Sequence, residues 1–472
     1  MTIKISGVEV DLNKIGIDFI PNEEQMAALE HLASFMKSDK DIITCVLSGS
    51  AGTGKTSLVK IFLEYVRLTH RSQIKLVAPT HKAKAVLSRL SSNTTATTLH
   101  KVLGLKPNFN ILEFDAKNMK FLDSLDFTLF DTIKELIIVD ECSMINNDLY
   151  DLLVKKANKK GKVLFLGDIK QIAPVKQGSV SKVFTNTDYP GINLNKVERQ
   201  RENPLINTLT KLRDNVVFDY ETEVNQDKGI YVHDIDSFKV ALSDSFFSLD
   251  VLNKAPQGVK ILAYTNNRVQ AFNRFARKLM AIGKEAVNKG EFLIAYDSYS
   301  RGFDQIIHNG TEYTVVSALY DFKDIPGFGN FEGYKLTLKE VHSEEILTVF
   351  LLDPEADDRK YEHLGIIVES LRMKAYEGNL RGKKKPYLWK PFYEINESFV
   401  CMRDIYFEGR VIRKKTLDYG YAMTIHKSQS STYTNVFVDL DNVNLCKDEN
   451  ERKQLQYVAL SRPTHCAHIL KN

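Results

Sequence analysis

The sequence predicts an α/β protein with two doubly wound parallel sheets, the second of which is interrupted by a β-rich insertion. Short and almost uninterrupted apolar runs alternate with helical patterns over the first two hundred residues. A second series of the same kind begins near residue 261 and resumes near residue 436. Such runs are typical of strands buried on both faces of a parallel sheet, joined by right-handed crossovers.

The first series defines a domain that we expect over residues 1–195. Its apolar runs lie at residues 42–48, 74–78, 136–139 and 163–166. The segment after the first run predicts a helix with one apolar face, because apolar side chains recur there at helical spacing: Leu58, Ile61, Phe62 and Tyr65. Residues 101–130 fit neither strand nor helix, so we expect an insertion there.

The second series predicts a domain made of residues 196–318 and 401–472. Its clearest strands are expected at residues 261–265 and 436–440. Between these parts, strand-like pieces at 334–341 and 346–352 precede a helical acidic stretch and a basic run from Arg381 to Lys385. Residues 319–400 are therefore expected to form an inserted β-rich domain. The basic run, with the aromatic residues after it, suits either a solvated loop or a nucleic-acid contact.

Composition excludes some classes of protein and leaves others open. With 472 residues, 43% hydrophobic and 26% charged, the chain is typical of globular proteins of about three domains. No run of eighteen apolar residues is present, and the start lacks the apolar core of a signal peptide, so we expect an intracellular protein. The five cysteines lack zinc-ligand spacing. The net charge of +4 is too small to identify a nucleic-acid binder.

A glycine-rich loop follows the first apolar run and precedes the first helix. It matches the P-loop pattern GxxxxGK[ST] in the residues Gly49, Ser50, Ala51, Gly52, Thr53, Gly54, Lys55 and Thr56. Glycines let the backbone N–H groups surround phosphates at a helix N-terminus, where the helix dipole favours negative charge. We expect Lys55 to reach the β- and γ-phosphates and Thr56 to place its hydroxyl on Mg²⁺.

Polar residues follow two further strands, at the sheet edge where ligands of open α/β sheets bind. Asp140 is expected to hold Mg²⁺, and Glu141 to orient and deprotonate the attacking water. A helix cap is the alternative for this carboxylate pair. Gln171, after the strand at 163–166, suits a sensor of the γ-phosphate or an ordinary loop residue.

Two late segments indicate a motor rather than a simple nucleotide hydrolase. Residues 419–431 read YGYAMTIHKSQSS, and residues 457–462 read YVALSR. Cationic groups that reach the γ-phosphate from a second domain couple hydrolysis to domain closure. Arg199 and Arg462 are the candidates, the alternative for each being a surface ion pair. A metabolic kinase or signalling switch has a single nucleotide domain, so the late segments argue against that class.

The motifs together resemble superfamily 1 helicases, in the branch that contains RecD and the phage Dda helicases. They occur in order, from Gln25 near the start, through the P-loop and GDIKQIAPV at 167–175, to the two late segments. The resemblance implies two RecA-like domains, a β-hairpin pin inserted in the first and an SH3-like module in the second. It further implies ATP-dependent movement from 5′ to 3′ on single-stranded DNA, with ATP and Mg²⁺ as cofactors.

The resemblance also implies roles for single residues. Gln25 would hydrogen-bond the adenine, Gln171 would connect the γ-phosphate to the DNA channel, and Arg199 and Arg462 would act as arginine fingers. The DNA backbone would be held by residues of both domains: Pro79, Thr80, His81, His100, Asn266, Thr424, His426 and Lys427. Phe114 is the candidate for the pin tip, the alternative being a small hydrophobic core beneath the insertion.

The chain departs from the family pattern at Ser430, where glycine is usual. Serine fits there only if φ stays negative or strain is tolerated. We expect a monomer that acts on single-stranded DNA and on junctions with duplex, in the cytoplasm of a phage-infected bacterium, alongside single-strand-binding or replication proteins. A translocase that remodels nucleoprotein without unwinding, and an RNA helicase, remain open alternatives.

Overall fold

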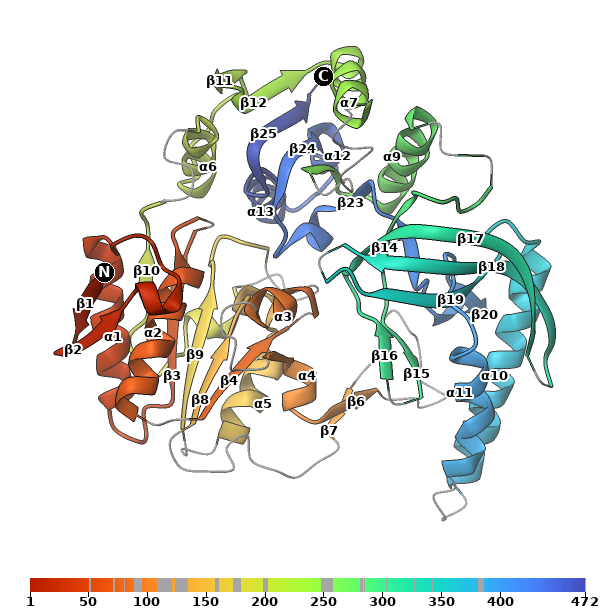
Figure 1. Cartoon of the computed structure of the whole chain (residues 1–472), viewed down its shortest axis with the longest axis horizontal. Helices are drawn as coiled ribbons and strands as arrows, with labels where there is room; N and C mark the ends of the chain where they lie inside the picture. Colours follow the sequence, from red (N-terminus) through yellow and green to blue (C-terminus); the bar gives the residue numbers. More distant parts are fainter. Residues whose placement is uncertain are drawn as a thin grey trace.

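The fold was examined in a computed structural model of the chain (Figure 1). No helix among the described residues is long and apolar enough to cross a membrane. The structure describes residues 1–50, 52–70, 73–79, 81–88, 96–107, 121–123, 135–157, 161–172, 180–197, 203–247, 258–280, 283, 285–302, 304–325, 327–341, 343–380 and 386–471.

The first domain is built on a six-stranded parallel sheet. Its strand order is β10-β3-β9-β8-β4-β5, comprising Ile192–Leu194, Thr44–Gly49, Gly161–Gly167, Glu135–Val139, Gln73–Ala78 and Ala96–Thr98. All four predicted strands belong to this sheet. The order places the P-loop strand β3 beside β9 and one strand away from β8, so the ends that carry Gly49, Gly167 and Asp140 lie along one edge.

Helices cover both faces of this sheet. On one face, α1 (Glu23–Lys37) and α2 (Lys55–His70) pack with the N-terminal hairpin of β1 (Thr2–Ile5) and β2 (Val8–Asp11). The other face packs against α4 (Leu99–Val102) and α5 (Asn147–Ala157). The apolar side chains predicted for α2 are all buried there. The domain is therefore doubly wound, as the sequence predicts.

The second domain carries another six-stranded sheet. Its order is β11-β12-β25-β24-β13-β23, comprising Glu223–Asn225, Lys228–His233, Pro463–Leu470, Tyr433–Asp439, Val259–Ala263 and Ala422–Thr424. Only the β11–β12 pair is antiparallel. One face packs on α6 (Leu205–Arg213) and α13 (Glu449–Leu460), and the other packs on α7 (Ile235–Phe247) and α9 (Asn266–Leu279). A short α12 (Leu440–Val443) follows β24.

An antiparallel sheet interrupts the second domain and projects to one side of it in Figure 1. Its order is β19-β18-β17-β14-β22, comprising Ile346–Leu352, Gly329–Glu340, Glu312–Ile325, Phe292–Ala295 and Leu417–Tyr419. Two small hairpins accompany it, β15 with β16 (Tyr299–Arg301, Asp304–Ile307) and β20 with β21 (Ile405–Phe407, Arg410–Arg413). The helices α10 (Asp358–Leu380) and α11 (Lys390–Asn396) pack on one face.

This sheet extends beyond the predicted limits of the insertion. The prediction placed the insertion at residues 319–400, but β14 and β22 lie outside that range on either side and pair antiparallel with each other. β14 is a short buried apolar segment, which looks alike in sequence whether the sheet is parallel or antiparallel, and β22 has only three residues, with Asp418 at its centre. Strand pairing, rather than local pattern, sets this boundary.

The insertion of the first domain begins as a hairpin. Strands β6 (Leu105–Pro107) and β7 (Phe121–Asp123) pair antiparallel, with Leu105 opposite Asp123. The residues between them, Phe114 included, lie outside the described part of the chain. The paired strands are consistent with the hairpin that the resemblance implies.

A buried ion pair joins the inserted sheet to the second domain. Lys260 of β13 is fully buried, and its Nζ lies 3.4 Å from Oε1 of Glu312 in β17 and 2.5 Å from the carbonyl oxygen of Gly420. The ammonium also lies 4.4 Å from the ring centroid of Phe292 and 5.3 Å from that of Tyr433. Removing one partner of such a pair leaves an uncompensated buried charge.

We expect Glu312→Ala to lower the free energy of unfolding by about 3–5 kcal/mol, because the Lys260 ammonium loses its carboxylate. The double variant Lys260→Met with Glu312→Leu should recover most of that loss, since no charge remains buried. Urea unfolding followed by circular dichroism measures both. Glu9→Ala, at the exposed pair with Lys4, is the control and should change stability by less than about 0.5 kcal/mol. A similarly small change for Glu312→Ala would contradict the anchoring role of the pair.

Candidate ATP site and nucleic-acid edge

A cavity of about 620 Å³ lies between the two α/β domains. The first domain contributes Phe19, Ile20, Asn22, Gln25, Gly52, Gly54, Lys55, Thr56, Ser57, Ala83, Asp140, Glu141, Gly167 and Gln171. The second contributes Ser430, Ser431, Thr432, Ser461 and Arg462. Residues separated by some four hundred positions therefore line one space, which combines cations, carboxylates, hydroxyls and the open face of a glycine-rich loop.

The P-loop needs its glycines for space and for backbone conformation. A Cβ on Gly49 would lie 2.9 Å from the Cβ of Leu194 and 3.0 Å from its carbonyl oxygen. Gly54 has φ +85°, and a Cβ there would lie 2.7 Å from Nε2 of Gln25. Side chains at these positions would separate the loop from β10 and α1. The loop is thus shaped as the sequence motif requires.

Lys55 and Thr56 begin α2 directly after the loop. The Lys55 ammonium donates hydrogen bonds back to the loop, to the carbonyl oxygens of Gly49 and of Ser50, the latter at 3.0 Å. Its charge is thereby held at the mouth of the loop, beside the N-terminus of a sixteen-residue helix. The arrangement suits an anion with several oxygens.

Asp140 and Glu141 follow β8 and line the same cavity. Burial, and then the neighbouring Glu141 charge, raise the pKa of Asp140 well above its ordinary value, while the Lys55 charge opposes the shift. Glu141 has φ 53° and ψ 41°, a left-handed conformation that is uncommon outside glycine, and its side chain makes no cap hydrogen bond. Glu141 thus makes no helix cap, whereas Oδ1 of Asp140 accepts the backbone N–H of Glu141 at 2.9 Å, and backbone strain of this kind is typical of functional sites.

Gln25 connects α1 to the P-loop. Its Nε2 donates to the carbonyl oxygen of Thr53 at 3.0 Å, and its Oε1 accepts from the backbone N–H of Asn22 at 3.1 Å. The Asn22 side chain in turn accepts from the backbone N–H of Gln25, which completes a capping box. One amide hydrogen and one lone pair of Gln25 remain for a ligand.

Phe19 and Ile20 precede this helix and line the cavity, yet sequence reasoning did not select them. Ile20 is 69% exposed and Phe19 37% exposed, unusually open for large apolar side chains at a cavity wall. Their position next to the motif of Gln25 was the available signal. They offer an apolar surface suited to a flat ring.

Gln171 is 7% exposed, and its Oε1 is buried without a hydrogen-bond partner among the described residues. It faces the cavity at the end of β9, next to Gly167. Its position is consistent with contact to a bound ligand. A buried amide oxygen left unpaired is costly unless a ligand or water satisfies it.

Arg462 closes the cavity from the second domain and is 5% exposed. Its guanidinium donates to neutral oxygens: the carbonyl oxygens of Val458 at 2.9 Å and Ser431 at 3.3 Å, and Oγ of Ser461 at 2.7 Å and 3.2 Å. Burial lowers the pKa of Arg462, while the charge of Glu141 across the cleft opposes the shift. The surface ion-pair alternative is excluded, because this arginine is buried in the cleft with neutral hydrogen-bond partners.

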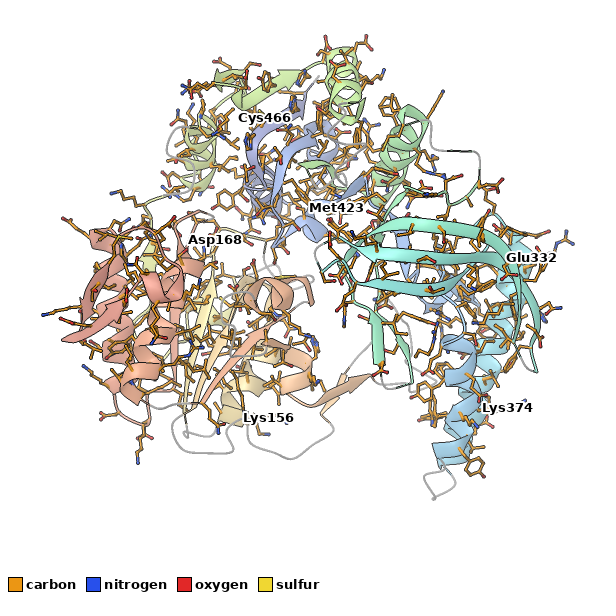
Figure 2. The ribbon with its side chains drawn as sticks, in the orientation of Figure 1. Lys156, Asp168, Glu332, Lys374, Met423 and Cys466 are labelled. Atoms are coloured by element: carbon orange, nitrogen blue, oxygen red, sulfur yellow. The ribbon has the colours of Figure 1, made fainter. Side chains whose placement is uncertain are left out.

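One further contact crosses between the domains and was not predicted. The Tyr457 hydroxyl of α13 donates to Oδ2 of Asp168 at 2.9 Å, and both side chains are buried. Figure 2 labels Asp168 at the edge of the first domain that faces the second. Tyr457 is one turn before Ser461 and Arg462, so this bond fixes the arginine segment against the end of β9.

Several predicted site residues lie outside the described part of the chain: Ala51, Thr80 and Arg199. Of His81, which begins α3 (His81–Ser88), the structure describes the backbone alone. Their assigned roles remain predictions.

The predicted nucleic-acid residues lie at two sheet edges. In the first domain Ala78 pairs with Thr98, so Pro79 and His100 follow the ends of neighbouring strands β4 and β5. In the second, Ala263 pairs with Thr424, so Asn266 and His426 follow the neighbouring strands β13 and β23. The Oδ1 of Asn442 accepts the backbone N–H groups of Tyr264 and Thr265, each at 2.9 Å, and fixes the second edge.

Burial favours the neutral form of two histidines at these edges, His100 and His426. Burial lowers the pKa of His100, and burial also lowers the pKa of His426, although Glu451 at 3.5 Å opposes the second shift. The ring of His426 lies 6.3 Å from that of Tyr264. These rings therefore suit stacking and hydrogen bonding rather than charge neutralisation.

Lys427 is directed toward the inserted sheet. Its Nζ lies 3.4 Å from the ring centroid of Tyr296, which Lys415 approaches at 4.2 Å. Tyr296 and Asn266 line a second cavity, of about 860 Å³, where α9 meets the inserted domain. The predicted lysine thus links the sheet edge of the second domain to the insertion.

Comparisons with known proteins agree with this arrangement. A family model described as an AAA domain matches residues 21–232. The ATP-dependent DNA helicase dda of Enterobacteria phage T4 is 25% identical, over 93% of this chain and 97% of that protein. The RecBCD enzyme subunit RecD of Buchnera aphidicola (subspecies Acyrthosiphon pisum) is 23% identical, over 85% of this chain and 66% of that protein.

Solved structures show the same fold at low identity. The Pif1 helicase of Candida albicans superposes with a TM-score of 0.51 at 19% identity, over 96% of this chain and 95% of that one. A Bacteroides Pif1 helicase, solved with ADP-AlF3 and single-stranded DNA, gives a TM-score of 0.50 at 15% identity, over 96% and 92%. The fold is that of two tandem RecA-like domains. The ordered motifs, the cleft that they line and the near full-length match to Dda bear out the resemblance to the superfamily 1 helicases of the branch that contains RecD and the phage Dda helicases.

Proposed function

We propose that this protein is an ATP-dependent DNA helicase that moves from 5′ to 3′ on single-stranded DNA. The observation that carries the proposal is the cavity between the domains, where Lys55 and Glu141 of one domain meet Arg462 of the other. Both walls come from one chain, so a single copy completes the cleft, and we propose a monomer as the active unit. We propose ATP as the nucleotide, since the Dda helicase, which this chain matches over nearly its full length, is named as ATP-dependent.

The residues at the loop fit a magnesium ion as well as a nucleotide. The hydroxyl of Thr56 and the carboxylate of Asp140 are hard oxygen donors that line one cavity, and Mg²⁺ prefers such ligands. We propose that these two residues hold Mg²⁺, which neutralises phosphate charge when bound. The raised pKa of Asp140 indicates that its ionised form needs cations beside it, and Lys55 already supplies one.

Each of the remaining side chains has its own role in binding or hydrolysing ATP. Glu141 orients the attacking water and accepts its proton, and Arg462 stabilises the charge that develops on the γ-phosphate. Gln171 and Arg199 are proposed to contact the same phosphate. The adenine packs on the apolar surface of Phe19 and Ile20, and the remaining amide hydrogen and oxygen lone pair of Gln25 form hydrogen bonds with it. Because Arg462 and Lys55 belong to different domains, ATP draws the cleft closed and hydrolysis releases it.

Stepping follows when the two sheet edges hold DNA alternately. Pro79, Thr80, His81 and His100 form the first grip, and Asn266, Thr424 and His426 form the second. Lys427, whose ammonium lies on the Tyr296 ring, supports the second edge rather than contacting DNA directly. Contacts to sugar and phosphate, together with stacking, let such a motor move over any sequence. The hairpin that starts with β6 and β7 is proposed to split the duplex at a junction, with Phe114 near its tip.

Unwinding of partial duplexes tests the proposal. Substrates carry a 5′ or a 3′ single-stranded tail, in DNA and RNA versions, and strand release is followed by fluorescence. We expect release of 5′-tailed DNA that depends on ATP and on Lys55. Activity on 3′-tailed DNA alone would overturn the direction, and preference for RNA would overturn the substrate. ATP hydrolysis stimulated by single-stranded DNA without strand release would indicate a translocase that does not unwind.

A further inference from the structure

Ser430 has an unusual backbone conformation for its residue type. Its φ is +62°, in the left-handed region where a Cβ is disfavoured and glycine is usual. It follows the short 3₁₀ turn Ile425–Ser428 and precedes β24. The family resemblance points to glycine here, so the sequence left open whether serine would avoid this conformation. The structure shows that it adopts it.

The hydroxyl of Ser430 also lacks a hydrogen-bond partner. Its Oγ is buried, and no donor or acceptor among the described residues satisfies it. The neighbouring serines differ in this respect: Ser428 Oγ donates to the carbonyl oxygen of Ile425 at 2.7 Å, and Ser431 Oγ donates to that of Gln429 at 3.4 Å. Ser430 therefore carries both backbone strain and an unsatisfied hydroxyl, while glycine would carry neither.

The position of Ser430 indicates what could satisfy the hydroxyl. The residue lines the cavity between the domains, together with Lys55 and Arg462. Its segment is held in place, since Arg462 Nη1 donates to the carbonyl oxygen of Ser431 at 3.3 Å and the backbone N–H of Tyr433 donates to that of Arg462 at 3.0 Å. Hydrogen bonds thus hold the segment of Ser430 against Arg462, on the side of the cavity that the second domain forms.

We propose that Ser430 is a nucleotide ligand whose hydroxyl donates a hydrogen bond to a phosphate oxygen of ATP, beside Arg462. This inference rests on the proposed ATP site and adds to it a contact made by a side chain where glycine makes none. Phosphate is the acceptor favoured by the surroundings, because the cavity contains the Lys55 ammonium and the Arg462 guanidinium. The contact forms only between the domains, so it favours the closed cleft.

Two substitutions at this position distinguish the contribution of the hydroxyl from the contribution of the backbone strain. Ser430→Ala removes the hydroxyl and keeps a Cβ at positive φ, whereas Ser430→Gly removes both. The affinity of the full-length chain for a non-hydrolysable ATP analogue and for ADP is measured by calorimetry, with Mg²⁺ present. Thermal unfolding without nucleotide is measured in parallel.

We expect both variants to bind the ATP analogue about 10- to 150-fold more weakly than the native chain, as for loss of a hydrogen bond to a charged group. Ser430→Gly should also unfold at a higher temperature than Ser430→Ala, because glycine relieves the strain. A loss confined to the ATP analogue places the hydroxyl at the γ-phosphate, and a loss shared with ADP places it at the α- or β-phosphate.

Binding within twofold of the native affinity for both variants would overturn the inference. Weak binding in Ser430→Ala with native affinity in Ser430→Gly would still support the hydroxyl contact, because the native chain and Ser430→Ala carry the same strain and only glycine relieves it. Lys55→Ala distinguishes this failure from failure of the ATP site itself. If the native chain binds the analogue through Lys55 while the Ser430 variants are unaffected, only the role of Ser430 is wrong.

Discussion

Arg462→Ala is expected to lower the rate of ATP hydrolysis stimulated by single-stranded DNA by about 10³-fold or more, the range for loss of an arginine finger. The large effect is expected from the position of the Arg462 guanidinium. The guanidinium is buried in the cleft, held by neutral oxygens and opposite Lys55, so its charge is available to the γ-phosphate as charge develops there. Binding of nucleotide should fall far less than the rate, because Lys55 and the loop stay intact.

Steady-state hydrolysis with saturating single-stranded DNA measures this effect, and calorimetry with a non-hydrolysable ATP analogue measures the binding. Arg462→Lys should recover little, since one ammonium cannot replace the planar guanidinium and its fixed set of hydrogen bonds. Arg359→Ala, at an exposed arginine of α10, is the matched control and should leave the rate unchanged. Hydrolysis by Arg462→Ala within tenfold of the native rate would contradict the assigned role.

Glu141→Gln should lower the hydrolysis rate by about 10²- to 10⁴-fold, which is the usual contribution of a positioned general base to the rate. The amide keeps the size of the side chain but cannot accept the proton of the attacking water. Substitution also removes the charge that helps to raise the pKa of Asp140, so that Asp140 should ionise at lower pH in the variant. Nucleotide binding should therefore be kept or strengthened while turnover is lost.

Single-turnover hydrolysis and analogue binding, each measured with Mg²⁺ from pH 6 to 8, distinguish these effects. The expected result is a variant that binds ATP and single-stranded DNA together without unwinding. The control is Glu449→Gln, the same substitution at an exposed carboxylate that begins α13 and is not among the residues lining the cavity. Loss of nucleotide binding in Glu141→Gln, with native turnover at saturation, would assign this carboxylate to binding instead.

Local patterns were enough to predict much of the fold. All six apolar runs taken as strands of the two α/β domains are strands of parallel sheets, and Lys55 begins the helix that the P-loop motif requires. The burial of such runs on both faces produces their continuous apolar character. The limits of the inserted domain could not be predicted from local pattern, because the short strands β14 and β22 show their antiparallel pairing only in the folded sheet.

The sequence by itself determined the chemistry of the nucleotide loop, since a motif of eight consecutive residues specifies a local backbone shape wherever it occurs. Only the tertiary structure decided which distant groups meet it. Arg462 opposite Lys55, the bond from Tyr457 to Asp168 and the left-handed, unsatisfied Ser430 depend on how two domains pack. Contacts between residues hundreds of positions apart leave no periodic signal in the chain, because side-chain spacing reports a residue's own helix or strand and not its neighbour across a cleft.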